Sequence, residues 1–458
     1  MAAELIITIS GMRGIVGENL TASVATDYGC AFGTFLKRNL AESGRGLSVC
    51  IGRDSRVSGQ MLSSALADGL CSAGVDVVKL GIVTTPGVGI MTRQLNCAGG
   101  VVITASHNPA EYNGIKLLLG NGVAPPSRLA EQIKKVFLEK DFELVGSASR
   151  GRISQNDQTD AVHIEKVLAI VDKVAIGESK FKVVLDSVNG AGGRVGVKLL
   201  KELGCEVVAM NNEPTGLFVH VPEPTKENLV DLCGKVIGLG ADVGFGLDPD
   251  GDRLAIVDEG GRYIGEEYTL ALAAKYVFSR STGKAAANLS TSRMIDDVAG
   301  AAGCEVIRTA VGEANVAEAM IENGCVIGGE GNGGVIDLRV GPVRDSLVGM
   351  ALVLGLMTET CKSAGALADE VGGYYMDKSK VKSDPEQTEY IIAKAKETFS
   401  EARIDTTDGA RFDFADGWLH IRPSNTEPVM RVIVETRSAD SAQEYIDIVN
   451  GILKEVLG

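Results

Sequence analysis

The pattern of apolar runs and turn residues repeats three times along the first three quarters of the chain. Each copy has a helix-length apolar pattern that ends at glycine, followed by an acidic residue and two β-branched residues. These endings lie at 73–78, 203–208 and 302–307, and each is preceded by a further apolar run, at 48–53, 182–186 and 285–289. A strand, a helix that stops at glycine and a second strand form a right-handed βαβ unit, so the sequence predicts three such units.

A third hydrophobic strand is expected after each unit, and each of these strands ends in a loop rich in polar residues. The strands are expected at 100–104, 243–247 and 325–329, and the loops follow directly. Ligand sites in α/β sheets gather at the carboxyl ends of the strands. We therefore expect the three loops to face one site.

The last part of the chain has a different pattern. Helices are expected over 386–402 and 441–456, with strands near 410–414, 418–421 and 430–436 between them. The predicted fold class is α/β: three tandem, topologically similar domains with mixed sheets, plus a C-terminal α+β domain, arranged around a central cleft. The expected domains are I at 1–152, II at 153–256, III at 257–370 and IV at 371–458.

The composition predicts a protein with several domains that binds neither nucleic acid nor membrane. At 458 residues the chain is too long for a single core. Its 45 Lys and Arg stand against 60 Asp and Glu, a formal charge of −15 that would repel nucleic acid and anionic lipid. An anionic substrate would therefore need a local cluster of Arg and Lys.

The cysteines and the first residues predict a cytoplasmic protein. Nine cysteines occur without a C-x-x-C pair, which favours reduced thiols over disulfides or zinc ligands. The first residues lack a basic region and are expected to form a strand, not a signal peptide. No apolar stretch approaches the length of a membrane span.

The first polar loop contains Ser106 and His107 in the segment Thr-Ala-Ser-His-Asn-Pro. The residue before Pro109 is biased toward extended geometry, so a non-helical turn is expected. Ser106 is a candidate nucleophile, with an ordinary polar loop serine as the alternative; no Gly-x-Ser-x-Gly elbow surrounds it. His107 is poorly placed to act as its base and is expected to orient the loop or contact phosphate.

The second loop, Asp-Pro-Asp-Gly-Asp-Arg, carries three carboxylates at alternate positions: Asp248, Asp250 and Asp252. They would repel one another without a cation, and Mg²⁺ suits few carboxylates together with a phosphate oxygen. A calcium loop is the rival interpretation, because Glu259 falls at its twelfth position. Against it, Arg253 stands where that loop needs glycine, and strands flank the segment. Ser106 and this loop together indicate phosphoryl chemistry on a serine.

Further polar residues are candidates for binding sugar and phosphate. Glu330 and Asn332 lie in a glycine-rich loop that suits vicinal sugar hydroxyls. Lys116 is a candidate acid, base or phosphate contact, with a surface lysine as the alternative, and Arg13 follows the first strand. A loop in the last domain is rich in donors that suit a phosphate dianion, with a solvated turn as the alternative. These donors are Arg422, Ser424, Asn425, Thr426 and Arg431.

The four loops, at 104–109, 248–253, 330–334 and 422–428, occur in the order and approximate spacing of the α-D-phosphohexomutase superfamily. The chain resembles this superfamily over essentially its whole length. Its members move a phosphate between the 1- and 6-positions of an aldohexose. The resemblance implies a phosphoserine at Ser106 and one Mg²⁺ bound by that phosphate and the three aspartates. It also implies a hexose or hexosamine phosphate as substrate, a sugar bisphosphate as intermediate and activator, and a monomer or homodimer.

The resemblance also assigns roles to the candidate residues. It implies catalytic roles for Ser106, Lys116, Arg253, His107 and Arg13. It implies substrate binding by Glu330, Asn332, Glu313, Arg422, Ser424, Asn425, Thr426 and Arg431.

Two departures from the superfamily pattern concern the part that reads the sugar. The loop is Glu-Gly-Asn-Gly-Gly where many relatives have Glu-x-Ser-Gly-His, so Asn332 and Gly334 stand at the Ser and His positions. Glu313 stands where others often carry Asp or His. The loop variant and the Ser-Gly-Met-Arg-Gly opening most resemble the phosphoglucosamine mutase branch, with phosphomannomutase/phosphoglucomutase as the alternative. More distant alternatives are a sugar-phosphate phosphatase and a non-catalytic sugar-phosphate sensor.

Overall fold

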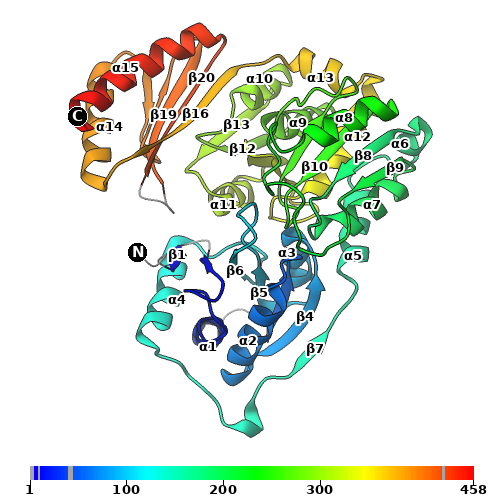
Figure 1. Cartoon of the computed structure of the whole chain (residues 1–458), viewed down its shortest axis with the longest axis vertical. Coiled ribbons are helices and arrows are strands. Elements are labelled where there is room, and N and C mark those ends of the chain that lie inside the picture. Colours follow the sequence, from blue (N-terminus) through cyan, green and yellow to red (C-terminus); the bar gives the residue numbers. More distant parts are fainter. Residues whose placement is uncertain (1–4, 9–10, 40–44, 425–428, 458) are drawn as a thin grey trace.

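The computed structural model describes residues 5–8, 11–39, 45–424 and 429–457. Four β-sheets follow one another along the chain, each with helices packed against it (Figure 1). In this view the first sheet lies at the bottom, the second and third lie in the upper centre and right, and the fourth lies at the upper left. The sheets occur in the order of the four predicted domains, while the exact boundaries stay predictions.

The first sheet has seven strands in the order β1-β2-β6-β5-β3-β4-β7. These strands are β1 (Ile6–Thr8), β2 (Gly11–Ile15), β3 (Gly46–Arg53), β4 (Asp76–Ile82), β5 (Cys97–Ile103), β6 (Tyr112–Leu119) and β7 (Ile153–Gln155). The helices are α1 (Ala22–Asn39), α2 (Gly59–Ser72), α3 (Thr85–Gln94) and α4 (Ser127–Glu139), followed by a 3₁₀ turn at Ser147–Ser149. β3 is parallel to β4 and β5, whereas β5 is antiparallel to β6, so the sheet is mixed as predicted.

The second and third sheets have four strands each, in the orders β11-β10-β8-β9 and β13-β12-β14-β15. The second contains β8 (Lys182–Asp186), β9 (Glu206–Met210), β10 (Val243–Leu247) and β11 (Leu254–Val257). The third contains β12 (Lys284–Asn288), β13 (Glu305–Thr309), β14 (Ile327–Glu330) and β15 (Gly334–Ile336). The helices of this part are α5 (Thr159–Leu168), α6 (Lys173–Ser179), α7 (Gly192–Glu202), α8 (Val230–Leu239), α9 (Glu267–Arg280), α10 (Met294–Ala301), α11 (Glu313–Asn323), α12 (Ser346–Thr360) and α13 (Ala364–Val371).

One strand order is common to the three sheets, which confirms the threefold repeat. Four consecutive strands of each sheet, taken in chain order, lie side by side as fourth, third, first and second: β6-β5-β3-β4, β11-β10-β8-β9 and β15-β14-β12-β13. Glycine stops the helix of each unit, as predicted: Gly74, Gly204 and Gly303 follow α2, α7 and α10 with φ of +85°, +80° and +67°. The third strands β5, β10 and β14 therefore lie at equivalent interior positions.

The fourth sheet is antiparallel, with the order β16-β20-β19-β18-β17. Its strands are β16 (Tyr375–Lys382), β17 (Arg403–Asp405), β18 (Ala410–Asp413), β19 (Gly417–Pro423) and β20 (Val429–Thr436), and its helices are α14 (Pro385–Thr398) and α15 (Ala439–Leu457). β16 was not predicted, because it is a largely exposed edge strand without an apolar pattern. α14 ends four residues before the predicted position. The next residue, Phe399, turns into the core against the rings of Phe412, Phe414 and Tyr445.

The hydrophobic core is continuous between the second and third sheets. Its central element is α12, which is buried from Ser346 to Met357 and packs against α5, α6, α7 and α9. A helix that is apolar on all sides is typical of a protein interior. Among the described helices, none is long and apolar enough by itself to cross a membrane; α12 and α13 meet that test only together, as a pair bent by 89°.

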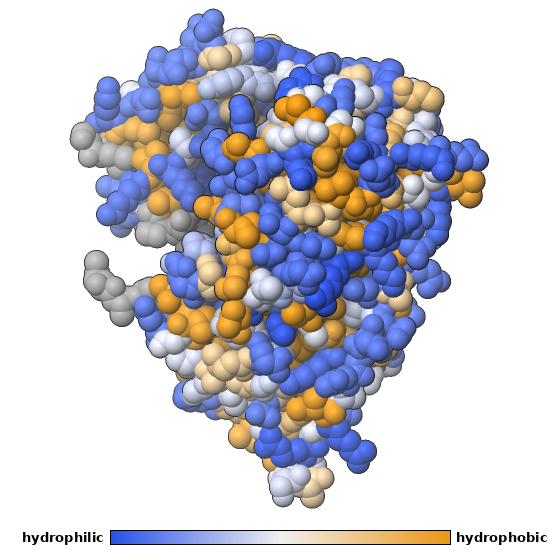
Figure 2. Space-filling model, turned by 45° about the vertical axis from the view of Figure 1, so that its right-hand side comes forward, coloured by the Kyte–Doolittle hydropathy of each residue, from blue (hydrophilic) through white to orange (hydrophobic). Residues whose placement is uncertain are grey.

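Polar residues dominate the face of the molecule that Figure 2 shows, whereas most of the thiols are inside. Figure 2 shows hydrophilic residues over most of the visible face, with smaller hydrophobic groups between them. All nine cysteines lie in the described part of the chain and all are free, and six of them are buried. This confirms the prediction of unpaired thiols.

Candidate active site

Ser106 lies in the loop between β5 and β6, at the carboxyl end of a third strand. Its side chain is buried, and its Oγ donates a hydrogen bond to Oδ2 of Asp248 at 2.8 Å. Its backbone N–H donates to Oγ1 of Thr104 at 2.9 Å. The φ of Ser106 is +49°, a left-handed conformation that costs free energy in a residue other than glycine. The surrounding contacts therefore hold the hydroxyl against the aspartate loop of the second sheet.

One buried guanidinium, that of Arg56, holds the path of this loop. Its Nε donates to Oδ2 of Asp54 at 3.0 Å, and Thr104 donates to the same oxygen at 2.7 Å. Its two terminal nitrogens donate, at 2.6–3.1 Å, to the backbone carbonyls of Ser106, Asn108, Pro109 and Tyr112. All five N–H groups of the guanidinium are therefore used. The ring of Phe218 from the second domain covers the guanidinium, 4.9 Å from its central carbon.

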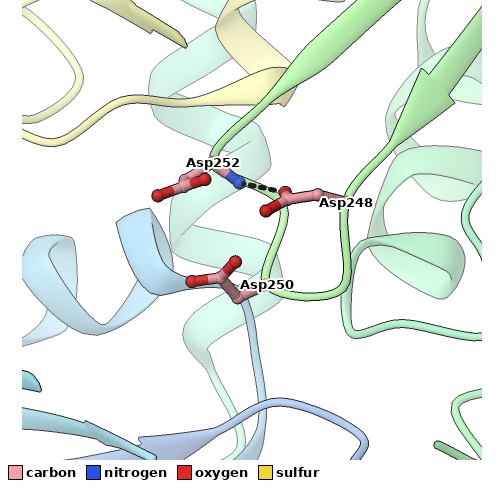
Figure 3. A group of neighbouring side chains, drawn as sticks. All are labelled: Asp248, Asp250 and Asp252. Atoms are coloured by element: carbon pink, nitrogen blue, oxygen red, sulfur yellow. Dashed lines mark hydrogen bonds between the residues drawn. The ribbon is translucent and has the colours of Figure 1, made fainter. Parts of the chain in front are cut away.

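The three aspartates form the loop between β10 and β11, and their carboxylates surround one small region (Figure 3). One oxygen from each of Asp248, Asp250 and Asp252 lies within 4.8 Å of the others, and all three residues are fully buried. The Oδ1 atoms of Asp250 and Asp252 have no hydrogen-bond partner among the described residues. Buried carboxylate oxygens without donors are costly alone and fit the oxygen-ligand preference of Mg²⁺.

Glu259, the twelfth position of the rival calcium loop, lies elsewhere. Its carboxylate accepts hydrogen bonds from Oγ of Ser363 and from the N–H of Gly365, at the start of α13. A calcium loop of the EF-hand type needs this glutamate as a ligand. That arrangement is therefore absent from the described residues.

Lys116 on β6 partly neutralises the aspartates. Its Nζ lies 2.8 Å from Oδ2 of Asp250 and 3.6 Å from Oδ2 of Asp252. Burial and the neighbouring carboxylates raise the pKa of Asp248 well above its usual range. Burial acts in the same direction on Asp250, but Lys116 and the hydrogen bonds outweigh it and lower the pKa of that carboxyl. Burial alone would lower the pKa of Lys116, yet the carboxylates outweigh it and raise that pKa. Lys116 is therefore a cation at neutral pH.

His107, Arg13 and Arg253 lie around the same loop. Nδ1 of His107 is 3.4 Å from Oγ of Ser106. Burial, together with the charges of Arg253 and Arg13, lowers the pKa of His107 to about 2, so its imidazole is neutral. Arg13 donates to Oδ1 of Asn108 at 3.1 Å. The predicted arginines thus place positive charge beside the serine.

The protein residues that are predicted to contact the sugar also lie close together. Oε1 of Glu330, at the end of β14, accepts a hydrogen bond from Asn288 at 2.7 Å, and Oε2 accepts one from Arg344 at 2.5 Å. Glu313 begins α11 and accepts the backbone N–H of Arg344 at 2.7 Å. Oδ1 of Asn332 is buried without a partner among the described residues. The loop therefore holds a buried acceptor whose hydrogen-bonding capacity is unused by the described residues.

The predicted phosphate loop joins β19 and β20, where Arg422 and Arg431 are paired across the two strands. Burial and the like charge of Arg431 lower the pKa of Arg422, while the carboxylates of Asp408 and Glu330 act in the opposite sense. Two neighbouring guanidinium groups favour an anion between them. Ser424 directly follows β19. Asn425 and Thr426 lie outside the described residues.

Four residues of the site were missed by reasoning from sequence: Asp54, Arg56, Glu223 and Arg344. Asp54 and Arg56 follow β3, so the strand-end rule that found the other loops could have found them. Glu223 accepts a hydrogen bond from Arg253 at 3.3 Å and lies in a long loop without periodicity. Arg344 follows β15, and no motif in the sequence marks it.

Comparison with known proteins shows a match to the phosphoglucomutase/phosphomannomutase family. Its alpha/beta/alpha domains I, II and III match residues 5–144, 161–261 and 265–374, and its C-terminal domain matches 376–451. A phosphoglucomutase/phosphomannomutase of Thermococcus kodakarensis is 41% identical over 453 residues, 98% of each chain. A probable phosphoglucosamine mutase of Methanopyrus kandleri is 36% identical over 457 residues, again 98% of each chain. A phosphoglucomutase/phosphomannomutase family protein from Burkholderia thailandensis has a similar crystal structure, with a TM-score of 0.87 and 30% identity over 98% of this chain and 97% of that chain.

The four domains and their order define an isomerase of the phosphohexomutase class. The chain belongs to the phosphoglucomutase/phosphomannomutase family. This confirms the superfamily, the fold class and the type of enzyme predicted from the sequence. The similar proteins carry the names of mutases for different sugars, one a phosphoglucomutase/phosphomannomutase and the other a probable phosphoglucosamine mutase.

Proposed function

We propose that the protein interconverts the 1-phosphate and the 6-phosphate of a hexose or hexosamine through a phosphoserine at Ser106. The observation that carries this proposal is the 2.8 Å hydrogen bond from Oγ of Ser106 to Asp248, inside a buried cluster of three carboxylates. A hydroxyl that carries a phosphoryl group and a cluster of oxygen ligands for a divalent cation are complementary parts. The paired Arg422 and Arg431 supply the donors for the second, non-reacting phosphate.

The reaction needs two transfers in opposite directions. In the first, the bond between phosphorus and Oγ of Ser106 breaks, and a bond forms to the free hydroxyl oxygen of the sugar. The hydroxyl proton passes to Glu313, since Lys116 is already a cation and a pKa of about 2 makes His107 too weak a base. The resulting bisphosphate turns so that its other phosphate faces Ser106 and returns there. A free bisphosphate would restore a phosphoserine lost by hydrolysis, and so would act as an activator.

Asp248, Asp250 and Asp252 are the residues that would hold Mg²⁺ together with a phosphate oxygen on Ser106. When bound, Mg²⁺ would neutralise charge that develops on the transferred phosphoryl group. The partnerless Oδ1 atoms of Asp250 and Asp252 support this assignment. Arg13, Arg253 and Lys116 add positive charge around the same serine and orient the phosphoryl group.

Glucosamine phosphate is the first candidate for the sugar. The Glu-Gly-Asn-Gly-Gly loop supports it, because it resembles that of the phosphoglucosamine mutase branch. Glucose and mannose phosphates are the second candidates, favoured by the 41% identity to a phosphoglucomutase/phosphomannomutase. Glu330, Asn332 and Glu313 are the residues proposed to contact the ring.

A substrate panel tests this function. The 1-phosphates of glucosamine, glucose, mannose and N-acetylglucosamine are supplied with Mg²⁺ and a trace of the corresponding bisphosphate, and 6-phosphate formation is followed. We expect one sugar to give the highest kcat/KM and chelation of Mg²⁺ to abolish turnover. Free phosphate is measured in parallel, because a phosphatase using the same serine would release it stoichiometrically. Such release, or no 6-phosphate from any sugar, would contradict the proposal.

A further inference from the structure

Arg344 bridges the aspartate loop and the sugar loop. It lies between β15 and α12 and is only 8% exposed. One terminal nitrogen, Nη2, donates to Oδ2 of Asp252 at 2.6 Å, and the other, Nη1, donates to Oε2 of Glu330 at 2.5 Å. A single side chain therefore connects a candidate metal ligand to a candidate sugar ligand.

The backbone around Arg344 is also anchored to domains II and III. Its N–H donates to Glu313, and the next residue, Asp345, caps α12 by accepting two backbone N–H groups. Ser346 reaches the aspartate loop: its Oγ donates to the carbonyl of Arg253 at 2.8 Å, and its N–H donates to that of Gly251 at 3.2 Å. Arg344 is therefore held through both terminal nitrogens of its guanidinium and through the backbone around it.

The space that Arg344 occupies explains the glycine at position 334. A Cβ added to Gly334 would lie 2.1 Å from Cδ of Arg344, which is far below any van der Waals contact. The histidine that many relatives carry at this position could not coexist with Arg344 in its present place. Glycine at position 334 therefore leaves the space that the side chain of Arg344 fills.

The charges around Arg344 keep it protonated. Burial alone would lower its pKa, but Asp252, Glu313 and Glu330 outweigh this and raise the pKa well above its usual range. A neutral replacement would leave these buried carboxylates without their shared cation, which is strongly unfavourable.

We propose that Arg344 is a positioning residue for the sugar ring: it orients the carboxylate of Glu330 while anchored on Asp252. The inference rests on the proposed function and names a determinant of ring binding within it. Oε2 of Glu330 is held by Arg344, and Oε1 by Asn288 and by the N–H of Gly312 at 3.2 Å. A carboxylate offers about four acceptor positions, so one remains for a sugar hydroxyl, in a fixed direction.

The anchor on Asp252 has a specific consequence. Because Asp252 holds the other end of the guanidinium, a change at Asp252 alters ring binding even when no metal is present. Asp248 belongs to the same cluster, but its contacts are to Ser106 and to backbone N–H groups of its own loop. The two aspartates therefore form a matched pair for a test.

The first test measures binding by calorimetry in EDTA, in a Ser106→Ala background that cannot turn over. The probes are glucosamine 6-phosphate, glucose 6-phosphate and inorganic phosphate. We expect Arg344→Met to weaken binding of the better hexose phosphate about tenfold, as for loss of a hydrogen bond to a charged group, and to leave inorganic phosphate unchanged. Arg344→Lys should retain part of the affinity. The double variant Arg344→Met/Glu330→Gln should bind no more weakly than Glu330→Gln alone.

The second test compares Asp252→Asn with Asp248→Asn under the same conditions. Both replace a carboxyl group of the same cluster with an amide of nearly the same size, and inorganic phosphate reports any general effect on an anion. We expect Asp252→Asn to bind the hexose phosphate several-fold more weakly than Asp248→Asn. If thermal unfolding shows that Arg344→Met does not fold, this comparison alone tests whether Arg344 positions the sugar ring.

The outcomes separate this inference from the proposed function. If Arg344→Met binds the hexose phosphate like its parent, or weakens inorganic phosphate equally, Arg344 does not position the ring. Equal affinities of the two aspartate variants for the hexose phosphate would also overturn the inference. If the parent itself binds neither hexose phosphate more tightly than inorganic phosphate, the proposed function fails instead.

Discussion

The serine loop and the sugar loop follow equivalent strands, and each is organised by a buried arginine, but in different ways. Arg56 directs four of its five N–H groups to backbone carbonyls around Ser106. Arg344 directs its terminal nitrogens to the side chains of Asp252 and Glu330. The first arrangement fixes the path of the chain, whereas the second fixes the orientation of two carboxylates.

This difference suits the two tasks of the proposed reaction. Phosphoryl transfer needs one reacting oxygen at a constant position, because misplacement by about 1 Å can cost a hundredfold in rate. The ring site must accept the same sugar in two orientations. A carboxylate whose orientation is fixed by other side chains presents the same acceptor to either orientation of the ring, so contacts between side chains fit that task.

The largest expected effect separates transfer from binding. Ser106→Ala should lower kcat by about 10⁴-fold or more, because it removes the atom that carries the phosphoryl group. Affinity for the hexose phosphate, measured by calorimetry, should stay within a few-fold of the wild type. Ser72→Ala on α2 serves as the control and should change neither quantity. Full activity of Ser106→Ala would refute the assigned nucleophile. Loss of hexose phosphate binding would show that the serine loop also contributes to binding and is not separate from the sugar loop in this respect.

A smaller effect is expected when the serine loop is loosened. Arg56→Met removes the donors to four carbonyls and leaves Asp54 without its cation. We expect kcat to fall about a hundredfold with little change in KM. The free energy of unfolding, measured with denaturant, should fall by about 3–5 kcal/mol.

Arg53→Met is the matched control for this change. Arg53 donates to the backbone carbonyl of Asp54 and makes no hydrogen bond or ion pair with the described residues of the Ser106 loop, so its replacement should leave kcat near the wild-type value. Equal kcat values for the two variants would show that Arg56 contributes to stability alone.

The smallest effect concerns the contact between domains III and IV. His420 is fully buried on β19; its Nδ1 lies 2.9 Å from Oγ of Ser290, and its Nε2 lies 2.7 Å from the carbonyl of Asp408. Burial lowers the pKa of His420 to about 4. The unfolded chain binds this proton near pH 6.5, so stability is lost as the pH falls from about 6.5 to 4.

His420→Gln should remove this part of the pH dependence, because glutamine can keep both hydrogen bonds and does not titrate. The slope lost is at most about 1.4 kcal/mol per pH unit. It is measured by denaturant unfolding between pH 4 and 7, followed by the fluorescence of Trp418, the sole tryptophan, in the fourth sheet. A slope equal to that of the wild type would mean that His420 is not the group responsible.

The strands and their loops could be predicted because they carry strong local signals. β8 and β10 have the predicted bounds, since each is a short apolar run that ends at or directly before an aspartate. The repeated glycine stops and the threefold pattern predict that the serine, the aspartates and Glu330 lie at equivalent strand ends, where the structure has them. The edge strand β16 escaped because exposed strands lack an apolar pattern.

The contacts that organise the site could not be predicted. Arg56 lies 50 residues from Ser106, Arg344 lies 92 residues from Asp252, and Thr85 donates to Asp250 across 165 residues. Polar residues in loops show no periodicity, and their partners depend on how whole sheets pack together. The resemblance to a known superfamily supplied the candidate roles, but it did not supply these supporting arginines.

The interior position of the third strand matters for protein engineering. β5, β10 and β14 each have a strand on both sides, so residues beyond their carboxyl ends can be exchanged while the strand order stays intact. A chimaera that takes its sugar loop from a relative would therefore keep its scaffold. The exchanged unit must include position 344 together with 330–334, because Gly334 and Arg344 occupy one another's space. Grafting the loop alone would bring a side chain into a place that is already filled.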